Sequence, residues 1–134
     1  GILKSWVSQH QAAGCSRMRE IGSTKMAKSN LCKIEFYVPE THLEAVKNAM
    51  FETGAGKVGA YDSCAWQTLG HGQFRPKKSS DPYIGTKGSV ETISEFKVEM
   101  VCDGAVLSKV ILALKESHPY EEVAYSVIQL WSGD

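Results

Sequence analysis

Residues 32–54 read CKIEFYVPETHLEAVKNAMFETG, and this stretch predicts a strand that leads directly into a helix. Apolar and polar side chains alternate from Cys32 to Val38, which is the two-residue period of a half-buried strand. Pro39 has no backbone N–H to donate to a neighbouring strand, so we expect the strand to end there.

The helix that follows has its own start and stop signals. Thr41 and Glu44 have the spacing of a capping box, in which the hydroxyl accepts from a free helix N–H and the carboxylate reaches back. Gly54 is a typical residue at a helix end. The apolar side chains between them fall on one helical face, and they are Leu43, Val46, Ala49 and Met50. This pattern predicts a helix near residues 41–53.

A second strand and a loop are expected next. The strand is expected over residues 58–66, and a glycine- and proline-rich loop over residues 69–88, in which residues 73–75 could form a short strand. Alternation then predicts a long strand over residues 90–102. Phe96, Val98 and Met100 would face one way, and Glu95, Lys97 and Glu99 the other.

The end of the chain repeats the strand–helix–strand order. Asp103 is expected to cap a second helix over residues 104–117, whose apolar stripe is Leu107, Val110, Ile111 and Leu114. His118 precedes Pro119, and a residue before proline disfavours the α region, so the helix should end there. A last strand is expected over residues 122–130.

Two such halves predict a ferredoxin-like α+β sandwich: a four-stranded antiparallel sheet with both helices on one face. The uncovered face would carry a mixed row of side chains suited to a subunit contact, namely Glu35, Tyr37, Glu95, Lys97 and Glu99. An open sheet face and its edges leave surface to cover, so we expect a homo-oligomer.

Composition excludes several classes of protein. The 134 residues are 43% hydrophobic, which suffices for one core. Residues 1–25 hold four basic and one acidic side chain, which leaves 11 basic and 14 acidic ones elsewhere. A slightly acidic domain disfavours nucleic-acid binding, and the apolar runs are too short to cross a membrane.

Four cysteines lie far apart, with no CxxC pair, which disfavours a zinc finger and a thioredoxin-type site. They are Cys15, Cys32, Cys64 and Cys102. No secretory signal precedes the domain, so we interpret them as reduced thiols of a cytoplasmic protein.

Residues 1–30 are interpreted as an N-terminal extension to a single domain over residues 31–134. Met26-Ala-Lys-Ser resembles a translation start, so the preceding residues are a non-native remnant, an alternative upstream start or a processed leader. Their Arg and Ser content, with few acidic residues, is also typical of an organellar transit peptide. We expect residues 1–25 to be dispensable for folding.

An ordered set of motifs runs from Lys33 to Leu130. It comprises Val38-Pro39, Gly54-Ala-Gly56, Gly59-x-Tyr61, Cys64-x-Trp66, Gly70-x-Gly72-x-Phe74-Arg-Pro76, Pro82-Tyr-Ile-Gly85, Gly88-x-Val-Glu91, Glu95 and His118-Pro-Tyr-Glu-Glu122. The set resembles the inserted domain of the Nif-three-like dinuclear-metal-centre proteins, a domain that is similar to PII and CutA proteins. Trp66 stands where the family pattern has Phe.

The resemblance implies a PII/CutA-like fold and, by analogy, a trimer rather than a dimer. The lobes that carry the family's histidine and carboxylate metal ligands are absent from these 134 residues. Neither its two-metal centre nor its hydrolase activity is therefore carried over, and no catalytic residue is assigned.

Two irregular segments form the predicted ligand site. Residues 70–76 read as a binding loop whose backbone amides and Arg75 could hold an anion, although the Gly-Lys-Ser/Thr ending of a Walker loop is missing. Residues 118–122 form a turn at the end of the second helix. We expect the two segments to converge. The predicted ligand-binding residues are Gly70, His71, Gly72, Phe74, Arg75, His118, Tyr120, Glu121 and Glu122.

Structural roles for some of these residues stay open. His118 could join His71 and Glu122 around a divalent metal ion, or it could instead bond carbonyls at the helix end. Cys64 could join His71 in a soft-ligand site, or it could be a small buried hydrophobe. The glycine loop could be a turn in which Arg75 pairs with a carboxylate.

The sequence leads to three hypotheses about function. The leading hypothesis is a non-enzymatic regulatory or sensor-like module that binds a small ligand or divalent metal in a cleft between subunits, as the resemblance to PII and CutA implies. The second is a small metal-dependent, hydrolase-like enzyme using His71, His118, Glu121 and Glu122. The third is a module that docks onto another protein.

Overall fold

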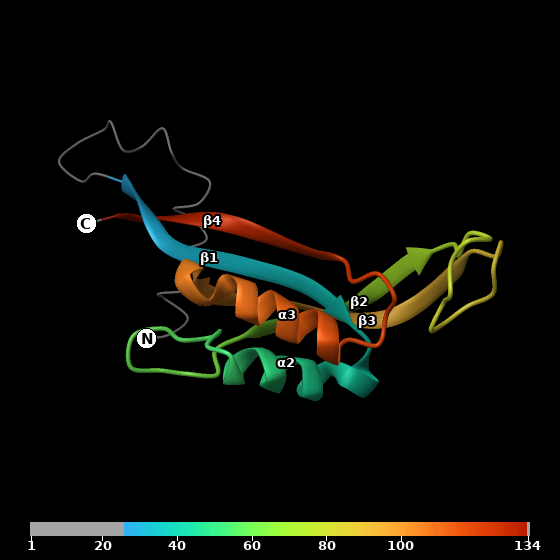
Figure 1. The fold of residues 1–134 in the computed structure, drawn as a ribbon, viewed down its shortest axis with the longest axis horizontal. Helices are drawn as coiled ribbons and strands as arrows, with labels where there is room; N and C mark the ends of the chain where they lie inside the picture. The colour runs from blue at the N-terminus through green and yellow to red at the C-terminus, as the bar shows by residue number, and fades with distance from the viewer. Residues whose placement is uncertain (1–25, 134) are drawn as a thin grey trace.

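The computed structural model describes residues 26–133, which form an antiparallel sheet covered on one face by two helices (Figure 1). The strand order is β2-β3-β1-β4, and every neighbouring pair is antiparallel. This topology confirms the predicted ferredoxin-like fold. The strands are β1 (Met26–Val38), β2 (Trp66–Phe74), β3 (Glu91–Asp103) and β4 (Tyr125–Gly133). The helices α2 (Leu43–Glu52) and α3 (Leu107–Ser117) follow the short 3₁₀ turns η2 (Glu40–His42) and η3 (Gly104–Val106).

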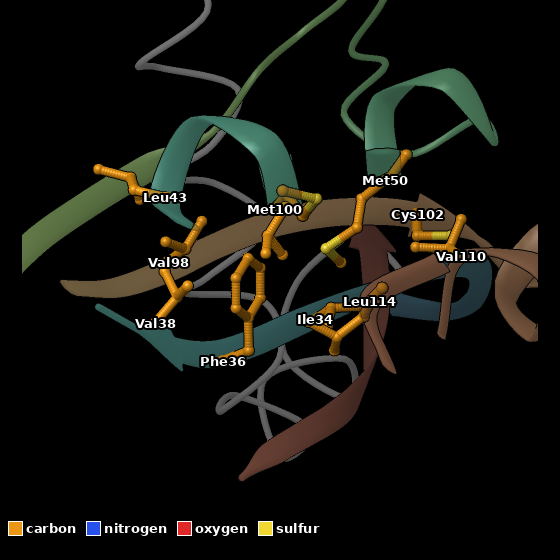
Figure 2. Close-up of a cluster of buried hydrophobic side chains, with 12 residues drawn as sticks. Ile34, Phe36, Val38, Leu43, Met50, Val98, Met100, Cys102, Val110 and Leu114 are labelled. Atoms are coloured by element: carbon orange, nitrogen blue, oxygen red, sulfur yellow. The ribbon is translucent and has the colours of Figure 1, made fainter. Parts of the chain in front are cut away.

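The hydrophobic core lies between the sheet and the helices. Phe36 pairs with Val98 and Ile34 with Met100, so the buried alternate residues of β1 and β3 stand opposite one another. Figure 2 shows the side chains of Ile34 and Phe36 directed from β1 into the cluster. Burying each such side chain stabilises the fold by about 1.5–3 kcal/mol. A one-residue slip would turn them all to the other face, so this burial selects the register.

The two helices begin differently. Asp103 caps the turn η3 that leads into α3, because its Oδ1 accepts from the Ala105 N–H at 2.8 Å, whereas α3 itself has no side-chain cap. The predicted capping box at Thr41 is wrong: no side chain caps α2, and the Thr41 hydroxyl contacts His42 Nδ1 at 2.9 Å. The turn η2 is already closed by the His42 N–H, which donates to the Pro39 carbonyl at 3.0 Å. Thr41 therefore lies inside a turn rather than ahead of the helix.

The predicted strand over residues 58–66 is also wrong. This segment is a series of turns, with positive φ at Gly59 and Ser63. Just before it, the Gly56 N–H donates to the Val101 carbonyl of β3. The strand begins only at Trp66 and takes in the first part of the predicted loop, residues 69–74. Pairing with β3 satisfies backbone N–H and C=O groups of residues 66–74, and this outweighs the low strand propensity of glycine.

Two strand boundaries also shift. The first strand, β1, begins at Met26, within the segment interpreted as an extension, and Met26 pairs with Gly133 at the end of β4. The last strand spans Tyr125–Gly133 rather than residues 122–130. The hypotheses about residues 1–25 lie outside the described part of the chain. Among the helices of residues 26–133, none has the length and apolar character needed to span a bilayer.

Candidate functional site

A pocket of about 1220 Å³ lies between the β2–β3 hairpin and the turn that follows α3. Figure 1 shows that the hairpin extends beyond the helices, next to the connection between α3 and β4. The two predicted segments therefore face one pocket, although they are far apart in sequence. Eight of the predicted residues line it, namely Gly70, His71, Gly72, Phe74, Arg75, Tyr120, Glu121 and Glu122.

Two hydrogen bonds join the turn to the hairpin and its loop. The Tyr120 hydroxyl donates to Glu95 Oε2 at 3.2 Å, and the Asp81 N–H donates to Glu121 Oε2 at 2.6 Å. Glu95 belongs to β3, and its carboxylate lies over Gly72 of β2, in space that a β-carbon there would need. Glycine at this position therefore lets Glu95 reach Tyr120.

The predicted backbone anion site is not formed as a loop. Residues 70–74 are paired with β3 in an antiparallel ladder, in which Gly70 stands opposite Glu95. The alternative, in which Arg75 pairs with a carboxylate, is not found either: within residues 26–133 the structure gives Arg75 no ion pair, and its side chain is exposed. Arg75 is thus an available cation at the edge of the pocket.

The uncovered sheet face supplies a network of ion pairs beside the pocket. Lys33 Nζ lies 3.0 Å from Glu35 Oε1 and 3.1 Å from Glu99 Oε1. Lys97, which lines the pocket, lies 3.3 Å from Glu35 Oε2. Burial acts to raise the pKa of Glu35, but the hydrogen bonds from Lys33 and Lys97 outweigh it and hold the pKa below its ordinary value. The carboxylate is therefore ionised at neutral pH.

His118 stands behind the pocket rather than in it. The residue is 7% exposed, with Nε2 2.6 Å from the Tyr37 carbonyl and Nδ1 3.1 Å from the Tyr120 N–H. A carbonyl can only accept and an amide N–H can only donate, so Nε2 carries the proton and Nδ1 does not. Burial lowers the pKa of His118, the bond to Tyr37 opposes that shift, and nearby His42 adds to it.

These bonds define a structural role for His118. The expected partners were carbonyls at the helix end, whereas the imidazole bonds the carbonyl of Tyr37 at the end of β1. Both ring nitrogens are occupied in this arrangement. Among residues 26–133, no group of three or more His, Cys, Asp or Glu side chains is placed to hold a metal ion. The predicted set of His71, His118 and Glu122 is therefore not assembled within one chain.

Cys64 lies away from the pocket. It packs with Val58, Val101 and Leu130 in a small apolar cluster, and burial raises the pKa of its thiol. A protonated thiol is a poor metal ligand. The reading of Cys64 as a small buried hydrophobe thus fits the geometry, and the soft-ligand site with His71 does not.

Sequence reasoning included Phe74 and Tyr120 but missed two further aromatic residues of the pocket, Tyr37 and Tyr83. The Tyr83 ring lies 6.3 Å from that of Tyr120 and 5.9 Å from that of His42, measured between ring centroids. Tyr37 also lines the pocket. The motif Pro82-Tyr-Ile-Gly85 was a usable signal, because three of its four residues line the pocket.

The chain is similar to part of several longer bacterial proteins. No family model matches the chain. Among curated proteins, it is 39% identical over 102 residues to a GTP cyclohydrolase 1 type 2 homolog of Mycobacterium leprae, covering 76% of this chain and 26% of that protein. A homolog of the same name from Halalkalibacterium halodurans is 38% identical over 101 residues, which cover 75% of this chain and 27% of that protein. The chain spans about a quarter of the length of these relatives.

The similar solved structures include one NIF3-related protein and others that share the fold. A Bacillus cereus protein related to NIF3 matches with a TM-score of 0.66 and 28% identity, over 87% of this chain and 33% of that one. CutA from Xylella fastidiosa matches with a TM-score of 0.57 and 17% identity, over 75% of this chain and 84% of that one. GlnK of Bacillus subtilis matches with a TM-score of 0.51 and 17% identity, over 75% of this chain and 85% of that one. The last two likenesses show the fold alone. The predicted resemblance to the NIF3-related domain and its PII/CutA-like fold is confirmed.

Proposed function

Because the chain carries the PII/CutA-like domain that is found within NIF3-related proteins, we propose that it is a non-enzymatic regulatory module that binds a small ligand. The binding site is the pocket between the β2–β3 hairpin and the turn of residues 120–124. The observation that carries this proposal is the convergence of the two segments on one pocket of about 1220 Å³. Pockets for small ligands are typically clefts of several hundred Å³ or more with a few convergent polar groups.

The side chains around the pocket suit a ligand with both charged and flat groups. The hairpin and its loop contribute Arg75 and Lys77, whose side chains are exposed. The turn contributes Glu121 and Glu122. Phe74, Tyr83 and Tyr120 offer aromatic faces. The carboxylates and cations can orient the ligand, while the rings contact its apolar part.

A divalent metal is the second ligand to test. One structural neighbour is described as the periplasmic divalent cation tolerance protein CutA from Archaeoglobus fulgidus, at 17% identity. Within one chain, His71 and Glu122 line the pocket without a third ligand among the described residues. A metal site there would need further groups, which a second copy of the chain could supply. His118 is left out of this proposal, because both its ring nitrogens are hydrogen-bonded.

The proposed assembly is a homo-oligomer, a trimer by analogy, built through the uncovered sheet face. By register, Trp66 lies opposite Glu99 and Ile128 opposite Lys33, which places both apolar side chains on that face. They are 49% and 36% exposed. Replacing Ile128 by Glu should lower the mass measured by light scattering at micromolar concentration. Leu112→Glu, on the exposed side of α3, should not.

A calorimetric screen tests the proposed function. ATP, ADP, inorganic phosphate, Zn²⁺, Cu²⁺ and Mn²⁺ are titrated into the full chain and into the double variant Arg75→Ala, Glu122→Ala. We expect saturable binding of one probe, lost in the double variant while the far-UV circular dichroism is unchanged. The control pair, Lys109→Ala with Glu116→Ala on α3, should bind normally. Turnover of a bound probe would favour the enzyme hypothesis, and binding of none would favour protein docking.

A further inference from the structure

A chain of contacts connects buried His118 to the pocket. The Tyr120 N–H donates to His118 Nδ1, while the hydroxyl of the same residue donates to Glu95 in the pocket. The two rings also pack edge to face, with 4.6 Å between centroids. The next residue, Glu121, accepts from the Asp81 N–H across the pocket. The protonation state of the His118 imidazole therefore affects the turn that forms one wall of the pocket.

The surroundings of His118 offer little to a second proton on its ring. The end of β1 presents the Tyr37 carbonyl, which already takes the Nε2 proton. The turn presents the Tyr120 ring and amide, and η2 presents the imidazole of His42, which disfavours a further positive charge. The last turn of α3 contacts it through backbone, since the His118 N–H donates to the Leu114 carbonyl at 3.0 Å. Within residues 26–133, no carboxylate forms an ion pair with His118.

We propose that protonation of His118 opens the pocket, so that binding there is regulated by pH. A proton on Nδ1 would point at the Tyr120 N–H, and two donors cannot bond each other. The turn must then move, and it takes the Tyr120 hydroxyl away from Glu95 and Glu121 away from Asp81. This inference rests on the proposed function for its consequence, because the pocket must bind a ligand for its opening to matter.

The coupling can be measured without a ligand. In the ¹⁵N-labelled full chain, hydrogen exchange of the Tyr120 and Asp81 amides is followed from pH 7.5 to pH 5.5. Both amides should lose protection as the His118 ring titrates, by about tenfold for one lost net hydrogen bond. The variants His42→Gln and His71→Gln remove the other two imidazoles of the described residues. The loss should persist in both.

His118→Asn is the matched variant. An asparagine side-chain oxygen can accept from the backbone N–H two residues later, as Nδ1 does here, and it does not titrate. The Tyr120 and Asp81 amides should therefore stay protected at both pH values in this variant. In His118→Ala they should be unprotected at both.

Two results would overturn the inference. One is amide protection in the unmodified chain that stays constant while the His118 ring resonance titrates. The other is an equal loss of protection in His118→Asn. Neither depends on a ligand. If no probe bound in the calorimetric screen, only the proposed function would be overturned. The hydrogen-exchange result would still stand.

Discussion

The carboxylate of Glu95 occupies the space that a β-carbon on Gly72 would need. The neighbouring Gly70, directly opposite Glu95 in the register, has open space at the same point. The two glycines of one strand therefore differ in role, because only Gly72 allows Glu95 to lie across β2 toward Tyr120.

Gly72→Ala should displace Glu95 and break its hydrogen bond with Tyr120. Tyr120→Phe should cost about 1–2 kcal/mol of unfolding free energy in the unmodified chain, as for a hydrogen bond to a charged group, and far less in the Gly72→Ala background. Urea denaturation of the four proteins in the double-mutant cycle measures this coupling.

Gly70→Ala is the control for that cycle. It should leave the cost of Tyr120→Phe unchanged. If Gly70→Ala and Gly72→Ala changed the cost of Tyr120→Phe equally, the contact between Glu95 and Gly72 would not be what holds the pocket together.

The stability of the chain should depend on His118 in mildly acidic solution. Burial lowers the folded-state pKa of His118, whereas an unfolded histidine titrates near 6.5. Below about pH 6.5 the unfolded chain takes up a proton that the folded chain resists, so the unfolding free energy should fall as pH drops toward the folded-state pKa. The slope from this group is at most about 1.4 kcal/mol per pH unit.

His118→Asn should remove this component of the pH dependence. Denaturation of both proteins at pH 7.5, 6.5 and 5.5 provides the measurement, and His71→Gln, at an exposed histidine, should retain the slope. Parallel curves for the unmodified chain and His118→Asn would contradict the assignment.

The ion network of the uncovered sheet face should depend on Lys33. Lys33→Met leaves Glu35 and Glu99 directly opposite each other on β1 and β3 without their shared cation. Like charges in this position repel, so we expect a loss of about 1–3 kcal/mol and a rise in the pKa of Glu35. Denaturation and carboxylate NMR titration measure the two effects.

A pair with an exposed carboxylate serves as the control for that network, because the Glu44 side chain is 70% exposed whereas those of Glu35 and Glu99 are 15% and 14% exposed. Glu44 and Lys47 lie 2.9 Å apart on the surface of α2. Glu44→Gln should cost less than about 0.5 kcal/mol. If Lys33→Met were equally mild and the Glu35 carboxylate titrated unchanged, the network would be an incidental surface contact.

The two helix starts should respond differently to loss of their polar side chains. Asp103→Ala removes an acceptor for the Ala105 N–H and should lower the unfolding free energy by about 1 kcal/mol. Thr41→Ala should have little effect, because the Thr41 hydroxyl bonds a neighbouring side chain rather than a helix N–H. Thermal denaturation of the two variants measures the difference, and a larger loss for Thr41→Ala would contradict the observed caps.

The sequence by itself determined the core and hence the fold class. Alternation in residues 32–38 and 90–102, with the apolar stripes of two helices, leaves one way to bury Ile34, Phe36 and Met100 together: a sheet with helices on one face. Local signals also placed the end of α3, because proline restricts the residue before it whatever the rest of the chain does.

The position of β2 and the roles of the pocket residues were decided only by the tertiary structure. Gly70 and Gly72 read locally as a loop, yet pairing with β3 makes them strand, because ladder bonds outweigh propensity once a partner is adjacent. Likewise, the sequence shows that His118 stands before a turn, but not that the Tyr37 carbonyl, 81 positions away, lies 2.6 Å from its Nε2. Burial and long-range partners set a side chain's protonation and availability, and neither exists until the chain has folded.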